Sequence, residues 1–143
     1  MILVHGTEDR LVPYDGSEGS LFGFYPSGRN LSTFESARYF ASRAGLVSPP
    51  VTIRSVSTDG FPVEFFRWQD DSAKEVQLVT IHGAGHVFPQ PYYRARHILG
   101  PSPKDPNIAE VIWKFFSDRS EQVRDSGTDS PPTLPLGPER LRQ

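Results

Sequence analysis

The chain has 143 residues, 36% of them hydrophobic, which is enough for the core of one small domain. Its net charge of −2 gives no electrostatic case for binding nucleic acid or an anionic membrane. It has no cysteine, which excludes disulfides and thiolate chemistry, and no apolar run approaches the ~20 residues of a membrane-spanning helix.

The first predicted element is a strand over residues 1–5, an apolar run typical of parallel strands that are covered on both faces. Because this strand starts without a lead-in, we expect the chain to begin inside a larger fold. Residues 6–31 hold five glycines and two prolines and show no regular period. They predict a long structured loop, and loops of this length are usually functional or disordered.

A helix is predicted over residues 32–44. Ser32 and Glu35 have the spacing of a capping box, and Gly45 supplies a C-terminal stop. The apolar residues of this segment recur with helical spacing and predict one buried face, made of Phe34, Ala37, Ala41 and Ala44.

Three strands are predicted next. Residues 51–56 and 62–68 flank a tight-turn signal at residues 58–60, which favours an antiparallel hairpin. Residues 76–81 form a largely apolar strand, and a second long loop with four prolines follows over residues 87–104.

The last predicted element is a helix over residues 105–117, with Asp105 as its cap and Pro106 at its first position. Its core-facing positions are expected to be Ile108, Val111, Ile112, Phe115 and Phe116. Residues 118–143 have no apolar period and predict a disordered tail. Strands that alternate with capped helices indicate an α/β domain over residues 1–117 with a small, mainly parallel sheet.

The turn after the first strand carries a candidate catalytic acid. Asp9 follows Gly6 at the carboxyl end of a predicted parallel strand, where open α/β sheets place their ligands. A carboxylate there can orient an imidazole and stabilise its cation. Asp9 can equally tie down its own loop, as Asp often does in turns, and the neighbouring Glu8 is an alternative acid.

The turn after residues 76–81 carries a candidate base. Gly83 and Gly85 make a low-bulk turn that lets His86 reach into a cleft, and histidine is the usual general base near neutral pH. His86 can also be an ordinary surface or core histidine. A metal pair with His82 is disfavoured, because two glycines oppose the helix that this spacing needs. If the two strands are adjacent and parallel, we expect Asp9 and His86 to be hydrogen-bonded at ~2.6–3.2 Å.

Other side chains have less specific contexts. His5 and His97 lie in no comparable motif, and Trp68 and Trp113 are expected in the core. Aromatic residues of the two long loops either line an apolar substrate cleft or pack the loops down: Phe22, Phe24, Tyr25, Phe88, Tyr92 and Tyr93.

The order of the two motifs is that of the second and third members of a Ser…Asp…His triad. The serine of such a triad lies in a G-x-S-x-G turn, which this sequence does not contain. The nearest string, GSEGS at residues 16–20, has its serines in the wrong places. A site of this kind needs no cofactor and no metal ion.

Three segments together resemble the C-terminal part of an α/β-hydrolase esterase of the polyhydroxybutyrate depolymerase and feruloyl esterase group. They are residues 2–14, the turn at residues 82–89 and the helix end at residues 112–116. The resemblance covers residues 1–117 and implies an incomplete α/β-hydrolase fold. The first of these segments is also similar to prolyl-oligopeptidase-like serine peptidases.

The resemblance implies that Asp9 is the triad acid and His86 the triad base. It further implies a polyester or aromatic ester as the substrate, and an extracellular or periplasmic protein, although residues 1–4 are too short and uncharged for a signal peptide. The chain departs from the group at Phe88, where tryptophan is frequent, and at Ser17, where a second glycine is usual. The family's serine and oxyanion hole lie upstream of the matching segments.

Two functions of different classes follow. The first is hydrolysis of carboxylic esters by acyl transfer, for which this chain supplies an acid and a base but no nucleophile, so we expect it to be inactive alone. The second is a non-catalytic binding module on the same scaffold, in which an exposed sheet edge favours self-association.

Overall fold

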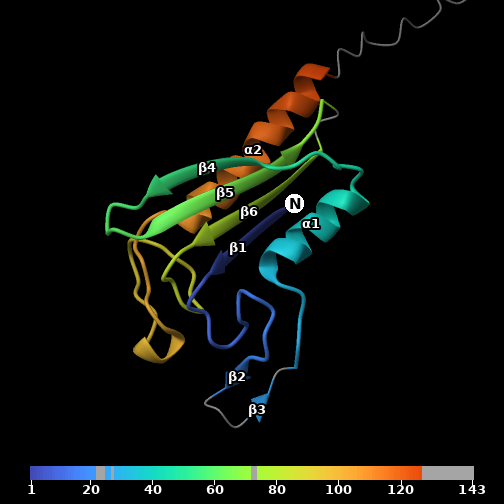
Figure 1. Cartoon of the computed structure of the whole chain (residues 1–143). Helices are drawn as coiled ribbons and strands as arrows, with labels where there is room; N and C mark the ends of the chain where they lie inside the picture. Colours follow the sequence, from blue (N-terminus) through green and yellow to red (C-terminus); the bar gives the residue numbers. More distant parts are fainter. Residues whose placement is uncertain (22–24, 27, 72–73, 127–143) are drawn as a thin grey trace, which may run out of the picture.

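The computed structural model describes residues 1–21, 25–26, 28–71 and 74–126. Its centre is a four-stranded sheet with the strand order β1-β6-β5-β4 (Figure 1). The strands of this sheet are β1 (Ile2–Gly6), β4 (Val51–Val56), β5 (Pro62–Gln69) and β6 (Glu75–Ile81). The helices are α1 (Thr33–Arg43) and α2 (Ile108–Ser126). The two long loops contain the short strands β2 (Ser20–Leu21) and β3 (Tyr25–Pro26) and the 3-10 turn η1 (His97–Leu99).

The sheet is mixed. β1 pairs in parallel with β6, whereas β5 runs antiparallel to both β6 and β4. The predicted hairpin of β4 and β5 is therefore confirmed. The expectation of a mainly parallel sheet was wrong, because a parallel pair needs a long crossover and β5 reaches both of its neighbours through short turns. The β1–β6 pair has such a crossover, which includes α1.

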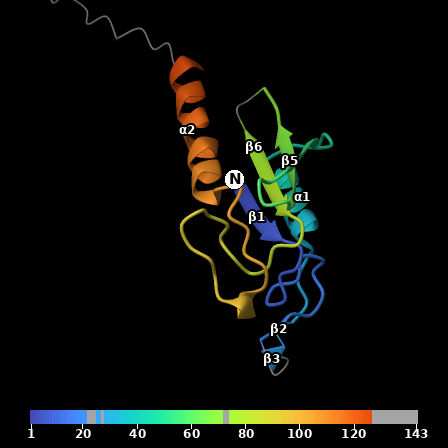
Figure 2. The same cartoon turned by 90° about the vertical axis from the view of Figure 1, so that its left-hand side faces the viewer.

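Helix α1 covers one face of the sheet and α2 covers the other, which makes three layers (Figures 1 and 2). On the α1 face, the buried side chains are Ala37, Ala41, Leu46, Trp68, Val76 and Leu78. On the α2 face, they are Val63, Val79, Ile81, Ala84 and Ile108. Successive residues of β6 alternate between the two cores, as expected for a strand that is covered on both sides.

The start of α1 confirms the predicted capping box. The Glu35 amide donates to the Ser32 hydroxyl at 3.2 Å, and the Ser32 amide donates to the Glu35 carboxylate at 3.2 Å. Ala37 and Ala41 are fully buried, so small side chains bring the helix close to the sheet. This capped end also places Thr33, the first residue of α1, beside the end of β1.

Helix α2 differs from its prediction at both ends. It begins at Ile108, because the Asp105 carboxylate accepts a hydrogen bond from the Thr58 amide instead of capping a helix at residue 105. It continues to Ser126, past the end expected at residue 117. The rest of the predicted tail, residues 127–143, lies outside the described residues.

The buried stripe of α2 is narrower than predicted. Ile108 and Phe115 are buried as expected, but Phe116 is exposed, and Trp113 is 75% exposed rather than in the core. One helix face can contact one sheet surface, so side chains that lie off this stripe stay in solvent. Trp68, by contrast, is a core residue as predicted.

Candidate active site

The carboxyl ends of β1 and β6 lie side by side, and the turn after each strand carries one of the candidate catalytic side chains. Two hydrogen bonds join these turns. The Glu8 amide donates to the Ala84 carbonyl at 2.9 Å, and the Gly83 amide donates to Thr7 Oγ1 at 2.9 Å. The two turns therefore form one rigid rim at the end of the parallel pair.

Glycine is required at two places on this rim because backbones approach each other closely. A Cβ atom added to Gly6 would lie 2.6 Å from the carbonyl carbon of Ala84. A Cβ atom added to Gly85 would lie 2.6 Å from the Cα atom of Gly100. Any side chain at either position would push the two turns, or the loop around Gly100, apart.

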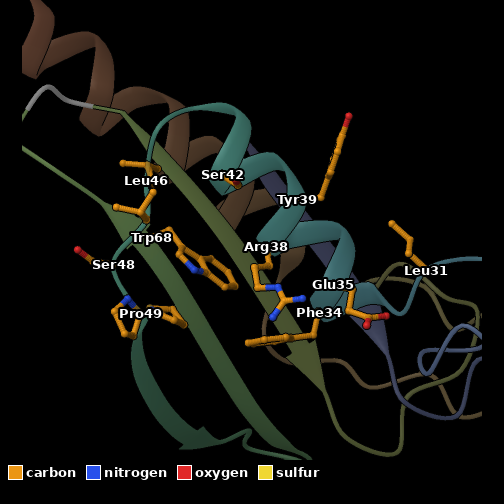
Figure 3. Close-up of a pocket in the computed structure, with 12 residues that line it drawn as sticks. Leu31, Phe34, Glu35, Arg38, Tyr39, Ser42, Leu46, Ser48, Pro49 and Trp68 are labelled. Carbon is orange, nitrogen blue, oxygen red and sulfur yellow. The ribbon is translucent and has the colours of Figure 1, made fainter.

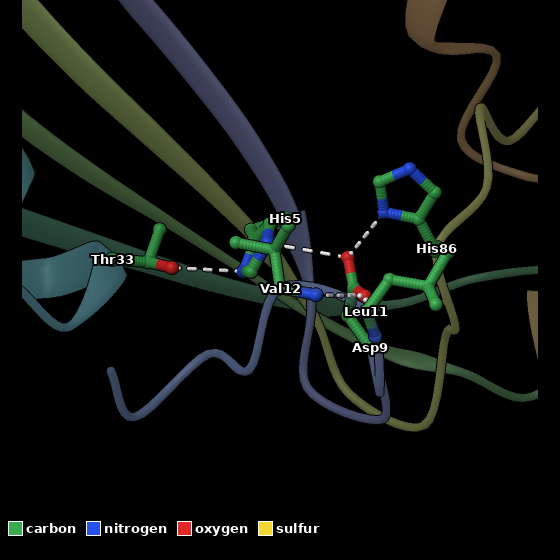
Figure 4. A network of polar contacts seen from close by, with 6 residues as sticks. All are labelled: His5, Asp9, Leu11, Val12, Thr33 and His86. Carbon is green, nitrogen blue, oxygen red and sulfur yellow. Dashed lines mark hydrogen bonds and ion pairs between the residues drawn. The ribbon is translucent and has the colours of Figure 1, made fainter. Parts of the chain in front are cut away.

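Asp9 is buried in the rim, with 5% of its surface exposed. Its Oδ1 accepts hydrogen bonds from the amides of Leu11 and Val12, both at 2.9 Å, and its Oδ2 accepts one from His86 at 2.8 Å (Figure 4). Asp9 thus ties down its own loop and also holds an imidazole. Glu8, the alternative acid, is exposed on the same turn, so the geometry favours Asp9.

His86 lies beside Asp9 as predicted, although the two are 77 positions apart in the sequence. Its Nδ1 is 2.8 Å from Asp9 Oδ2, and its Nε2 points away from that carboxylate (Figure 4). In the tautomer that donates Nδ1–H to Asp9, Nε2 has a lone pair available to take a proton. The His86 amide donates to the Leu99 carbonyl at 2.7 Å, which fixes the turn against η1.

The pair forms one wall of a small pocket of about 370 Å³. The residues that line it are Val4, His5, Gly6, Asp9, Val12, Gly85, His86, Val87 and Phe88. Of the loop aromatics expected at a cleft, Phe88 lines this pocket, whereas Tyr92 and Tyr93 are exposed on the surface. Phe22 and Phe24 lie outside the described residues, as does the side chain of Tyr25.

A second histidine contacts the same acid, which the sequence reasoning missed. His5 Nε2 lies 3.4 Å from Asp9 Oδ2, and His5 Nδ1 is 2.8 Å from Thr33 Oγ1. The ring also stacks on Tyr14, with a centroid distance of 5.7 Å. One signal was available in the sequence: a polar residue ends an apolar strand directly before Gly6, four positions from the acid.

His5 is one end of a polar row that crosses the sheet. In the register of the four strands, Arg54 faces Glu64, Glu64 faces Thr80, and Thr80 faces His5. Arg54 donates to Glu64 at 2.6 Å, and His82 lies 3.0 Å from the other oxygen of Glu64. These two contacts, with Arg54 the larger cause, lower the pKa of Glu64. His82 therefore contacts Glu64, whereas His86 contacts a different carboxylate, that of Asp9.

The stability of the folded chain is expected to decrease when His5 is protonated. Burial lowers the pKa of His5 below 6.5; Asp9 opposes this shift, and His86 adds to it. The unfolded chain therefore binds this proton more readily than the folded chain. The contribution of neutral His5 to the stability of the folded chain is thus present above pH 6.5. It is lost as the pH falls toward the pKa that His5 has in the folded chain.

Urea unfolding between about pH 7.5 and about pH 5 measures this dependence. We expect stability to decline more steeply in the wild-type chain than in His5→Gln, which cannot take up the proton. Carboxylates other than Asp9, which contacts His5, are in the same surroundings in both proteins and cancel in this comparison. Equal declines would show that His5 is not the group responsible.

A larger groove of about 700 Å³ lies elsewhere, between α1 and the chain that enters β4 (Figure 3). Phe34 and Trp68 contribute aromatic surface, and Arg38 lies between them in Figure 3. It shares no lining residue with the pocket at Asp9. Its carboxylate, Glu35, is engaged in the helix cap, so the groove offers no acid–base pair.

The chain matches no protein-family model, no curated protein and no solved structure. Within the described ranges, no group of three or more His, Asp or Glu side chains is arranged to hold a metal ion. In the same part of the chain, no helix is long and apolar enough to cross a membrane. Function is therefore inferred from the geometry of the rim.

Proposed function

We propose that Asp9 and His86 are the acid and base of a serine hydrolase site that acts on carboxylic esters, in an α/β-hydrolase fold similar to that of polyhydroxybutyrate depolymerases and feruloyl esterases. The observation that carries the proposal is the 2.8 Å hydrogen bond between His86 Nδ1 and Asp9 Oδ2 at the ends of two parallel neighbours. This is the place and the pairing that a Ser…Asp…His triad of this order requires.

In this mechanism His86 Nε2 takes the proton of the serine hydroxyl as the serine attacks the ester carbonyl. His86 then returns the proton to the leaving alcohol, and a water molecule repeats the sequence to release the acid. Asp9 keeps His86 in the correct tautomer and stabilises the imidazolium while it exists. In the described part of the chain, no serine hydroxyl is hydrogen-bonded to His86, and we place the nucleophile outside these 143 residues.

The edge of the sheet beside β1 supports this placement. β1 is a terminal strand of the sheet, yet Ile2 and Val4 pack against one core and Leu3 against the other. All three side chains are only half-buried. Edge strands of soluble proteins are usually short, charged or covered, so this apolar strand fits a position beside a further strand.

The proposal is tested by reaction with an activated short-chain ester. We expect the 143-residue chain to form no acyl-enzyme, because an acid and a base cannot do so without a nucleophile. A polypeptide in which further sequence with a serine nucleophile is joined before Met1 should form one, and His86→Ala should abolish it. A p-nitroanilide peptide serves as the control substrate for the peptidase alternative.

Two results would contradict the proposal. Acyl-enzyme formation by the 143-residue chain itself would mean that one of its own serines is the nucleophile, which contradicts our placement of the nucleophile outside the chain. A longer polypeptide that hydrolyses the ester equally well with and without His86 would remove this histidine from the mechanism.

We propose self-association as a second, non-catalytic property, carried by the opposite edge of the sheet. All six residues of β4 are exposed, including Val51, Ile53 and Val56, and β4 has a neighbour on one side only within the described sheet. Its free backbone groups and apolar side chains are suited to pairing with another copy. This property fits an interaction module as well as an incomplete hydrolase.

Sedimentation and light scattering over a range of concentrations test this edge. We expect the wild-type chain to associate and Ile53→Lys to shift it toward monomer, because a charge on an edge strand opposes pairing. Val47→Lys adds the same charge at an exposed position outside the sheet and should leave association unchanged. A wild-type chain that stays monomeric, or equal effects of both variants, would contradict the proposal.

A further inference from the structure

The Oδ2 atom of Asp9 lies between two imidazole rings, one of which has no part in the proposed mechanism (Figure 4). His86 Nδ1 is 2.8 Å from this oxygen, and His5 Nε2 is 3.4 Å from it on another side. The amides of Leu11 and Val12 bind Oδ1 and not Oδ2, so the two rings can both contact Oδ2. The way in which His5 is held therefore bears on how His86 is held.

His5 is the more firmly fixed of the two rings. It lies on β1, its side chain is 17% exposed, and it is held by Thr33 on one edge and by Tyr14 on its face. His86 lies on a turn, and its side chain is 49% exposed. The anchored neighbour of Oδ2 is thus His5, and His86 is the neighbour with more freedom to move.

The contacts of His5 also select its tautomer. A proton on Nδ1 would leave the lone pair of Nε2 facing a carboxylate oxygen at 3.4 Å, which is repulsive. With the proton on Nε2, the N–H faces Asp9 Oδ2 and the Thr33 hydroxyl donates to Nδ1 at 2.8 Å. Burial lowers the pKa of His5, which favours this neutral form near neutral pH.

We propose that His5 is a positioning residue for the Asp9–His86 pair: its Nε2–H holds Asp9 Oδ2 where that atom selects the Nδ1–H tautomer of His86. This inference rests on the proposed function, because a base of this kind needs its Nε2 lone pair free. His5 acts through Asp9 and does not touch the reacting atoms. Thr33 and Tyr14 support it by fixing the ring.

Nitrogen-15 NMR of the 143-residue chain in alkaline buffer tests the proposal, because the ring shifts report which nitrogen carries the proton. His5→Phe keeps a flat ring beside Tyr14 and removes the N–H. We expect it to reduce the ratio of the Nδ1–H to the Nε2–H form of His86 roughly threefold, the effect of one weak electrostatic contact. His5→Gln places an amide N–H near the position of Nε2 and should keep the wild-type ratio.

Two outcomes overturn the role of His5. An unchanged ratio in His5→Phe would show that Asp9 needs no help from this ring. If the tautomer ratio falls equally in His5→Phe and His5→Gln, the shape of the ring matters and its N–H does not. If His5→Phe does not fold, Thr33→Val replaces it: the ratio should fall by a smaller factor, and an unchanged ratio would overturn the proposal.

Asp9→Asn separates this inference from the proposed function. If wild-type His86 is mainly in the Nε2–H form, or if Asp9→Asn leaves its tautomers unchanged, the acid–base pair itself is refuted. If Asp9→Asn shifts the tautomers and His5→Phe does not, the pair stands and only the positioning role of His5 fails.

Discussion

Gly85→Ala is expected to destabilise the fold by about 3 kcal/mol, which is a large share of the stability of a small domain. The added methyl group would meet the backbone of Leu99 and Gly100, which cannot rotate away as a side chain can. The substitution would also strain the hydrogen bond from the Gly85 amide to the Pro101 carbonyl, now 2.9 Å long. Urea unfolding monitored by tryptophan fluorescence measures the loss.

Gly60→Ala is the matched control for this prediction. Gly60 has a φ of +88°, and no atom lies within 4 Å of the position of an added Cβ. Its substitution therefore costs only the strain of a left-handed backbone, about 1 kcal/mol. If both variants lose the same stability, the close approach of the turn and the loop does not matter energetically.

The second large effect is expected at Asp9, where two substitutions separate structure from chemistry. Asp9→Ala leaves the amides of Leu11 and Val12 without their acceptor, and we expect a loss of about 3 kcal/mol in the free energy of unfolding. Asp9→Asn retains an acceptor of the same shape for these amides, so its folding loss should be about 1 kcal/mol.

The effect of Asp9→Asn on activity should be far larger than its effect on stability. In a longer polypeptide that hydrolyses esters, Asp9→Asn is expected to lower kcat by ~10⁴-fold, because an amide N–H that faces His86 Nδ1 enforces the wrong tautomer. Glu8→Gln is the control, since this exposed neighbour should leave both stability and kcat unchanged. A stable Asp9→Asn variant with normal kcat would exclude Asp9 as the triad acid.

The proximity of Asp9 and His86 could be predicted because each residue follows an apolar strand directly. Parallel neighbours end at one rim, so adjacency of the strands was enough to bring the two turns together. The capping box at Ser32 and the hairpin at residues 51–69 were equally accessible, since both depend on residues close in the sequence. Local signals of this kind need no knowledge of the tertiary structure.

The role of His5 could not be predicted in the same way, because the residues that surround it come from distant segments of the chain. Thr33 comes from the start of α1, and the buried environment is made by the packed sheet. The length of α2 was missed for another reason. Residues 118–126 continue the helix without a clear apolar period, so a test for periodicity ends too early.

The parallel pairing of β1 with β6 also has a consequence for how the protein folds. The β4–β5 hairpin closes over a few residues, whereas the β1–β6 register pairs residues as far apart in the sequence as Ile2 and Gln77. The chain must lose the conformational entropy of so long a loop before any contact between β1 and β6 can form. We therefore expect the rim that carries Asp9 and His86 to assemble late, around a hairpin and helix that can form beforehand. The contact between Asp9 and His86 would then form only in the final step of folding.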